Sequence, residues 1–358
     1  MNKVFYFSII LFLFFTSCDT NDVELDNTAS FIAKFSFEKN LATTFGQSIP
    51  LTFEVKNKQI QKIELYLQDS LLETWKNPKG KLNYILDTKN YTLGSYQLQL
   101  KSYFASDESF YDTRLLRILS DVQPIELNAN ILNIYPHNET HFTQGLEFDG
   151  DNLYESIGDP NDTGASKLML VDLKSGKVIK EMGQERPIFA EGLTILGDKI
   201  FQLTYKNQKC LVYDKNSLQL LNEFVYSGEG WGLCNDGKYI IMSNGTEYLT
   251  FRDPSTFQIV KTIQVYDPLG PRIQLNELEY IEGKIWANIW MLDLLLEIDP
   301  INGKVLKEMN CNTVSSKGKG SGDVLNGIAF HQKTKHIYLT GKYWKNIFQV
   351  KFEEKKSL

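Results

Sequence analysis

Apolar and polar residues alternate along most of this chain, in short runs separated by turn-forming residues. Between residues 29 and 120 clear examples are SFIAKFSF, IPLTFEV, KIELYLQ, YQLQLKSYF and RLLRIL, and no helical period persists. A period of two places successive side chains on opposite faces of a strand, so each run predicts a half-buried strand. About seven such strands without a chemical motif favour an immunoglobulin-like β-sandwich over residues 29–120, which we expect to act as a spacer.

From residue 125 onward the alternating pattern is itself repeated. Each copy contains a hairpin turn with an alternating strand, and then a strand that ends in Asp and restarts after a tight turn. The Asp residues that mark these turns are Asp172, Asp214, Asp253 and Asp299. Asp close to Gly, Ser or Pro is typical of tight turns between antiparallel strands. Repeats of about 40–50 residues indicate a β-propeller, and five copies predict an all-β, five-bladed propeller over residues 125–354.

The two ends of the repeated region complement each other. The last copy ends after three strands, at IFQVKF, whereas residues 129–137 precede the first copy and have no hairpin partner. We therefore expect residues 129–137 to supply the outer strand of the last blade. This pairing would close the ring and remove an exposed sheet edge.

One phrase recurs near the start of a strand in each copy, and it reads QGLEF in the first and EGLTI in the second. Its third letter is always Leu or Ile, which predicts a core residue between blades. Its Gly suits close backbone approach near the axis, although Glu277 replaces it in the fourth copy. Equivalent positions lie at one height around the axis, so the varying first letters form a ring that is either a ligand site or a set of backbone caps. The ring positions are Gln144, Glu191, Trp231, Asn276 and Asn326.

Aromatic side chains and one cation reach the same end of the ring in this alignment. Phe142 and Phe189 lie two places before the ring positions of their copies, and Tyr205 and Trp290 end the second strands of theirs. Lys342 follows the equivalent strand of the last copy. Each aromatic alone also fits an inter-blade core, and the lysine alone also fits a solvated loop. Their convergence around one carboxylate favours a functional site.

Residues 1–18 have the pattern of an export signal. A short cationic start precedes an apolar run over residues 4–15, which is too short to span a bilayer, and small residues then lead to Cys18. The pattern resembles a bacterial lipoprotein signal that is cleaved before Cys18 and lipidated on its sulfur, with an ordinary secretory signal as the alternative. Residues 19–28 are polar and acidic and predict a tether. We expect a lipid-anchored protein of the cell envelope, periplasmic or surface-exposed.

The net charge, the cysteines and the histidines argue against some classes of protein and some kinds of site. A net charge of −6 without a basic tract argues against binding to nucleic acid. The cysteines other than Cys18 show no metal-binding spacing, and either one disulfide or buried free thiols would fit them. The histidines are too few and too scattered along the chain to predict a metal centre. These residues are Cys210, Cys234 and Cys311, and His137, His141, His331 and His336.

An ordered set of motifs resembles the plant and bacterial glutaminyl-peptide cyclotransferases, which are five-bladed propellers. The motifs are FTQGLEF, LYESIG, FAEGLT, GEGWGLCNDGK, NELEYIEGKIWANIW, LNGIAF and LTGKYW, and they cover about residues 131–352. By this resemblance Glu191 is the acid/base residue. Tyr205 departs from the family, which often has Trp there, and Glu155 matches a motif that we interpret as structural support. The pocket residues implied by the resemblance are Phe142, Gln144, Phe189, Trp231, Asn276, Trp290 and Lys342.

The resemblance implies that the protein cyclises the N-terminal glutamine of peptides or proteins to pyroglutamate and releases ammonia. Glu191 would move both protons, so no catalytic cofactor is expected, and the resemblance allows a structural calcium. We expect a monomer. Two other classes stay open, a non-catalytic peptide-binding propeller on a lipoprotein stalk and a metal-dependent propeller hydrolase. The hydrolase would need several carboxylates at the axis, where the ring offers only Glu191, with Glu277 one residue away from a ring position.

Overall fold

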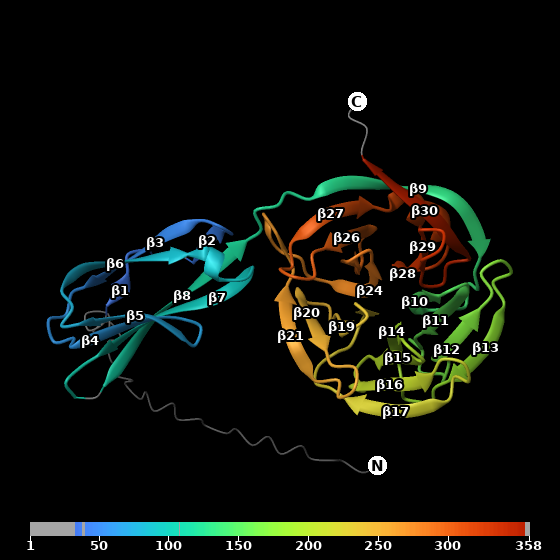
Figure 1. Ribbon diagram of the computed structural model, residues 1–358, viewed down its shortest axis with the longest axis horizontal. Helices are drawn as coiled ribbons and strands as arrows, with labels where there is room; N and C mark the ends of the chain where they lie inside the picture. The colour runs from blue at the N-terminus through green and yellow to red at the C-terminus, as the bar shows by residue number, and fades with distance from the viewer. Residues whose placement is uncertain (1–32, 38–39, 107, 355–358) are drawn as a thin grey trace, which may run out of the picture.

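The computed structural model describes residues 33–37, 40–106 and 108–354, which form two all-β units (Figure 1). The expected export signal over residues 1–18, its Cys18, and the tether over residues 19–28 lie outside the described residues. No helix in the described ranges has both the length and the apolar character that crossing a membrane requires.

The first unit consists of two sheets packed face to face. Its strands are β1 (Lys34–Phe35), β2 (Leu41–Thr44), β3 (Ser48–Val55), β4 (Lys62–Leu67), β5 (Ser70–Lys76), β6 (Gly80–Asp87), β7 (Gly94–Tyr103) and β8 (Ser109–Leu119), with the short 3-10 helix η2 (Thr88–Asn90) after β6. One sheet has the order β1-β3-β6 and the other β2-β8-β7-β4-β5. Phe53 on β3 and Leu65 on β4 are fully buried in one shared core. The alternating pattern was therefore a correct guide to strands in this region.

The second unit is a ring of β-sheets (Figure 1). Three of its sheets contain four strands each, and these strands follow one another in chain order from the axis outward. The strands are β10 (Thr143–Asp149), β11 (Asn152–Ile157), β12 (Lys167–Val171) and β13 (Val178–Gly183); β14 (Ala190–Leu196), β15 (Lys199–Thr204), β16 (Lys209–Asp214) and β17 (Leu220–Val225); and β18 (Leu233–Asn235), β19 (Ile240–Met242), β20 (Tyr248–Arg252) and β21 (Ile259–Gln264).

The rest of the ring is an eight-stranded sheet of order β24-β25-β26-β27-β9-β30-β29-β28, in which β9 joins two further strand groups. These strands are β24 (Leu275–Ile281), β25 (Lys284–Ile289), β26 (Leu294–Ile298), β27 (Val305–Asn310), β28 (Leu325–His331), β29 (His336–Gly341), β30 (Asn346–Glu354) and β9 (Ile125–Pro136). The start of β9 pairs with β27 in parallel, and most of its length pairs with β30 in antiparallel register. The outer strand expected from residues 129–137 is thereby confirmed.

The Asp residues predicted to mark tight turns lie between the third and fourth strands of their groups. The Asp172 carboxylate accepts the Ser175 amide N–H at 2.8 Å, and the Asp214 carboxylate accepts that of Ser217 at 2.6 Å. Such a short-range bond folds the chain back within a few residues, so the next strand begins in register with the previous one.

Two elements of the ring interrupt the repeat and were not predicted. They are the helix α1 (Asn312–Gly318) and the hairpin of β22 (Tyr266–Asp267) and β23 (Gly270–Pro271). The hairpin carries the Tyr266 ring into the core of the first unit, where the ring is fully buried. The Tyr266 hydroxyl lies 2.9 Å from the Ser95 hydroxyl, and the Ser95 amide N–H donates to Gln264 at 3.2 Å. The two units therefore share packed surface in addition to the connecting chain.

The cysteines in the described part of the chain are buried and free. They are Cys210, Cys234 and Cys311. Of the two alternatives that the sequence left open, buried thiols are confirmed and the disulfide is not formed.

Candidate active site

The innermost strands of the ring converge at the axis, and their glycines allow this approach. A Cβ atom on Gly145 would lie 2.6 Å from the amide nitrogen of Leu193, and one on Gly192 would lie 2.6 Å from that of Leu233. Such distances are too short for any other residue, so the predicted role of these glycines is confirmed. The apolar letters of the repeated phrase are all buried. They are Leu146, Leu193, Leu233, Leu278 and Ile328.

Glu277 stands where the other phrases have Gly, and its carboxylate bridges two inner strands of the ring. Its carboxylate accepts the Leu146 amide N–H at 3.3 Å and the Ile328 amide N–H at 2.9 Å, which joins the strands β10 and β28. Burial holds the pKa of Glu277 well above its usual range. The substitution is therefore a specific bridge between inner strands, whereas the sequence suggested only a relaxed glycine position.

Every pocket residue expected from the sequence lines one cavity of about 400 Å³, at the end of the ring where the inner strands begin. Asn326, which belongs to the predicted ring, does not line it. The lining residues that the sequence did not single out are Pro160, Met291 and Asp323, and all three lie outside the repeated phrases. The lining residues that were predicted are Phe142, Gln144, Phe189, Glu191, Tyr205, Trp231, Asn276, Trp290 and Lys342.

Glu191 is the buried carboxylate of this cavity. Its residue is 6% exposed, and burial holds the pKa of its carboxyl well above the usual range. The nearby charge of Lys342 lowers this pKa and that of Glu229 raises it further. The backbone carbonyl of Glu191 accepts the Ser156 hydroxyl at 2.5 Å, which fixes the main chain at this position. Burial therefore favours the neutral form of this carboxyl, while the Lys342 ammonium favours the charged form.

Lys342 is the cation of the cavity and is also buried. Burial lowers the pKa of its ammonium group, while the carboxylates of Glu191 and Asp323 raise it. Its Nζ lies 4.6 Å from the centroid of the Phe142 ring, which stabilises the charged form through a cation–π contact. Its backbone is held in place because the Lys342 N–H donates to the Val324 carbonyl at 3.0 Å.

Three amide side chains form a hydrogen-bonded row along one side of the cavity. Asn276 Nδ2 donates to Asn326 Oδ1 at 3.0 Å, and Asn326 Nδ2 donates to Gln144 Oε1 at 2.9 Å. Asn326 is fully buried behind the other two. In this row the side-chain oxygen of Gln144 accepts a hydrogen bond and the side-chain nitrogen of Asn276 donates one. The NH₂ group of Gln144 can therefore donate to a ligand, and the side-chain oxygen of Asn276 can accept from one.

Aromatic rings form the other walls of the cavity. The Phe142 and Phe189 centroids lie 6.1 Å apart in an edge-to-face pair, and those of Phe189 and Tyr205 lie 5.9 Å apart. Trp231 and Trp290 form a second edge-to-face pair at 5.6 Å. These rings lower the polarity around Glu191 and leave a narrow space between them.

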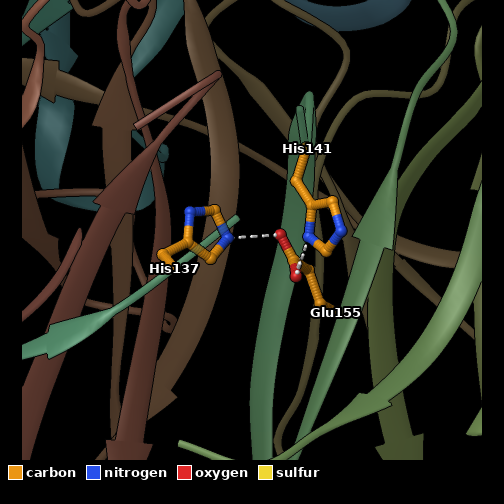
Figure 2. Close-up of side chains that lie close together, drawn as sticks. All are labelled: His137, His141 and Glu155. Carbon is orange, nitrogen blue, oxygen red and sulfur yellow. Dashed lines mark hydrogen bonds and ion pairs between the residues drawn. The ribbon is translucent and has the colours of Figure 1, made fainter. Parts of the chain in front are cut away.

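A cluster of His137, His141 and Glu155 lies beside the cavity (Figure 2). Figure 2 shows the Glu155 carboxylate between the two imidazole rings, with each oxygen bonded to one ring nitrogen at 2.9 Å. The other ring nitrogen of His137 lies 2.6 Å from the Trp344 carbonyl. Since both nitrogens of His137 face acceptors, both carry hydrogen and the ring is an imidazolium. We call this ion pair the clasp.

The clasp connects two segments that contain lining residues of the cavity, Phe142 and Lys342. His137 follows β9, His141 precedes Phe142 of the cavity wall, and Trp344 lies two residues after Lys342. The His141 carbonyl also accepts the amide N–H of Tyr343 at 2.7 Å. The scatter of histidines along the sequence was therefore misleading, because folding brings two of them together. The three side chains could offer ligand atoms to a metal, but their nitrogens and oxygens already bond to one another.

Comparison with known proteins places the ring unit in a family. The profile of the family named glutamine cyclotransferase matches residues 108–352 of this chain. The chain belongs to the glutamine cyclotransferase family. A glutaminyl-peptide cyclotransferase of Arabidopsis thaliana is 37% identical over 227 residues, which are 62% of this chain and 70% of that protein. The crystal structure of Myxococcus xanthus glutaminyl cyclase matches with a TM-score of 0.60 at 33% identity, over 65% of this chain and 100% of that chain.

The resemblance seen in the motifs is thereby confirmed, and the chain is an enzyme of the glutamine cyclotransferase family. The family match begins one residue before β8 and ends inside β30, so it starts earlier than the motifs indicated. The first unit, apart from its last strand, lies outside the match. This cyclotransferase therefore carries an N-terminal addition whose role the family does not explain.

Proposed function

We propose that this cyclotransferase converts the N-terminal glutamine of peptides or proteins to pyroglutamate, with release of ammonia. The observation that carries the proposal is a buried carboxyl of raised pKa, Glu191, in a cavity lined by aromatic rings, amides and one cation. The names of the Arabidopsis and Myxococcus relatives support this assignment.

In the proposed reaction the α-amine nitrogen of glutamine attacks its own side-chain amide carbon. The Glu191 carboxylate takes the proton that the attacking amine loses, and the new carbon–nitrogen bond gives a tetrahedral intermediate. The protonated Glu191 then donates this proton to the amide nitrogen, which leaves as ammonia as its bond to carbon breaks. Glu191 ends in its starting state, so one group serves both proton transfers.

The other polar groups of the cavity would stabilise the oxyanion and orient the substrate amine. The free NH₂ of Gln144 and the Lys342 ammonium can donate to the oxyanion of the intermediate, where one donor contributes about 3 kcal/mol. The free carbonyl of Asn276 can accept from the substrate amine, which aims the amine's lone pair at the amide carbon. The aromatic walls would hold the glutamine side chain folded, because a folded conformer brings the reacting atoms within reach.

We infer that the reaction requires no cofactor, since acid–base catalysis and oxyanion stabilisation account for its steps. A structural calcium would need oxygen ligands, and such oxygens lie along the axis. There the Glu147 carboxylate accepts the Ile195 amide N–H at 3.1 Å with one oxygen, while its other oxygen is buried without a partner among the described residues. Burial raises the pKa of Glu147 to about 8. These observations support Glu147 as the residue that would bind such an ion.

The decisive experiment follows ammonia release from a Gln-initiated peptide, with and without a chelator. We expect turnover in both conditions, and a mass decrease of the peptide that corresponds to loss of ammonia. A peptide that binds without turnover would support the non-catalytic alternative. Turnover of an ester only in the absence of chelator would support the metal-dependent hydrolase, which the family membership does not favour.

We further propose an architecture around this activity. The five strand groups of the ring are the blades of a propeller over residues 125–354, and the two-sheet unit over residues 29–120 is an immunoglobulin-like spacer. Residues 1–18 are a lipoprotein signal and residues 19–28 a tether, which place a monomeric enzyme at the cell envelope, periplasmic or surface-exposed. Its partners would be peptides or proteins with N-terminal glutamine and a membrane, and no nucleic acid.

The Cys18→Ser substitution is expected to release the protein from membranes. The apolar run of the signal is too short for a stable anchor, so attachment depends on lipid carried by Cys18. Fractionation of cells into membrane and soluble parts measures the effect. If the variant stays in the membrane fraction, the lipid anchor at Cys18 is not the means of attachment.

A further inference from the structure

The cavity opens beside an exposed apolar turn, which consists of Trp290, Met291 and Leu292. Their exposed fractions are 38%, 63% and 52%, although the preceding strand β25 is almost entirely buried. Trp290 and Met291 line the cavity that contains Glu191. A contiguous exposed apolar surface beside a pocket indicates contact with a ligand or partner.

The equivalent turns of the other strand groups differ from this one. The turn after β15 begins with Tyr205 and continues with Lys206, and the turn after β19 contains Asn244 and Gly245. The turn after β29 contains Trp344, which is apolar but fully buried. Polar residues are usual in such turns, so the exposed apolar side chains of Met291 and Leu292 distinguish this turn from those three.

The backbone of this turn is well defined. The Trp290 amide N–H donates to the Gln274 carbonyl at 2.9 Å, and that of Leu292 donates to the Ile289 carbonyl at 3.0 Å. Met291 lies between them in the left-handed region, with φ of 68°. Glycine or asparagine adopts this conformation at lower cost, so an asparagine at position 291 would not strain the turn.

The chemistry of the proposed reaction decides which part of the substrate meets this turn. Cyclisation joins the α-amine and the side-chain amide carbon of the same glutamine, and both must lie beside Glu191. The α-carbonyl of that glutamine carries the rest of the peptide, which has to leave through the mouth of the cavity. The first group outside the cavity is therefore the side chain of the second substrate residue.

We propose that Met291 and Leu292 form an apolar subsite for the second residue of the substrate, an inference that rests on the proposed function. The continuity of the turn with the cavity supports it, since Met291 both lines the cavity and extends into solvent. The subsite selects peptides in which the N-terminal glutamine is followed by an apolar residue such as leucine.

The test compares two peptides that differ only at the second residue, Gln-Leu and Gln-Asn, whose side chains have similar size. For the unaltered enzyme we expect kcat/KM to be about tenfold higher with leucine, the low end of the discrimination that apolar contacts give. In Met291→Asn and Leu292→Asn this ratio falls towards one. Asn tolerates the left-handed backbone at position 291, and general damage to the enzyme would lower both rates and leave the ratio unchanged.

The matched control is Ile301→Asn. Ile301 is 74% exposed and follows β26, whereas Leu292 precedes that strand, so it lies at the other end of the same sheet. This variant is expected to keep the full preference. Equal rates with the two peptides, or a preference that survives both subsite substitutions, overturn the inference while the proposed function stands.

Failure of the proposed function gives a different result, because neither peptide is then converted. In that case binding of the same two peptides, followed by the fluorescence of Trp231 and Trp290, decides the question. Tighter binding of Gln-Leu that is lost in Met291→Asn supports the subsite, and equal binding of both peptides overturns it.

Discussion

Glu191→Gln is expected to lower kcat by about 10³–10⁴-fold, the upper range of general acid–base catalysis, because in the proposed reaction this one group serves both proton transfers. The amide has nearly the shape of the carboxyl but cannot carry the proton from the attacking amine to the leaving nitrogen. Folding and peptide binding are expected to change little, since no hydrogen bond to the Glu191 carboxyl is formed by the described residues. Ammonia release measures the rate, and thermal unfolding measures the stability.

Glu229→Gln provides the matched control for this substitution. Its carboxylate lies outside the cavity lining, accepts the Trp231 indole N–H at 3.1 Å, and raises the pKa of Glu191. Removing this charge is expected to change kcat by at most about fivefold, which corresponds to the weak coupling of partly exposed charges. It should also move the acidic limb of the pH profile of kcat/KM to lower pH. If Glu191→Gln costs no more than Glu229→Gln, Glu191 does not carry the proton.

Glu155→Gln is expected to destabilise the fold by about 3–5 kcal/mol, because it leaves the buried His137 imidazolium without its counter-charge. The Glu155 side chain is fully buried between His137 and His141, and it also accepts the Thr143 hydroxyl at 2.7 Å. Urea-induced unfolding measures the loss. Activity should fall with the fraction of folded enzyme, since the clasp lies beside the cavity and does not line it.

The stability supplied by the clasp depends on pH in a defined direction. Interaction with both imidazoles holds the pKa of Glu155 below its ordinary 4.5 despite burial, and Glu155 raises the pKa of His137 above its ordinary 6.5 despite burial. The difference in unfolding free energy between the natural chain and Glu155→Gln should therefore be largest between those two values. It should shrink as acid protonates Glu155 and as base deprotonates His137.

Asp151→Asn is the surface counterpart of this substitution. Asp151 also contacts a histidine, His331, at 3.1 Å and a second cation, Lys333, at 2.7 Å, but its side chain is 73% exposed. No change in the midpoint of unfolding is expected. If both variants lose the same unfolding free energy, burial does not contribute to the stabilising effect of the clasp.

The cavity could be anticipated largely because it is built from equivalent positions of a repeat. Gln144, Glu191 and Asn276 share one place in the first, second and fourth copies of the phrase, and an alignment of the copies brings them to one height around the axis. The acid–base role that we propose for Glu191 came from the family resemblance and not from periodicity. Met291 and Asp323 were missed because they lie outside the strands. The residue types there do not recur from copy to copy, and the alternation of apolar and polar residues does not predict which side chains are exposed.

The strands were predictable for a similar reason, and the exceptions have physical causes. Alternation identifies a strand that has one face towards a core, and it correctly located β9 without a neighbour in sequence. The β22–β23 hairpin has two-residue strands, which are too short to show any period. The clasp unites His137 and His141, which lie in the loop between β9 and β10, with Glu155 on β11, and no period of the sequence marks such a contact.

The pairing of β9 with β30, which closes the ring, also determines when the ring can form during synthesis of the chain. Strand β9 is the first of the ring to leave the ribosome, yet its antiparallel partner β30 is the last described strand, and Asn133 bonds to Gln349, which lies 216 residues later. Contacts so distant in sequence form late, because the loop between them must be ordered first. Lys342 and the Trp344 carbonyl arrive with the same final segment. A partly synthesised chain therefore has neither a closed ring nor a complete cavity, and the enzyme gains its chemistry only when its last strand is in place.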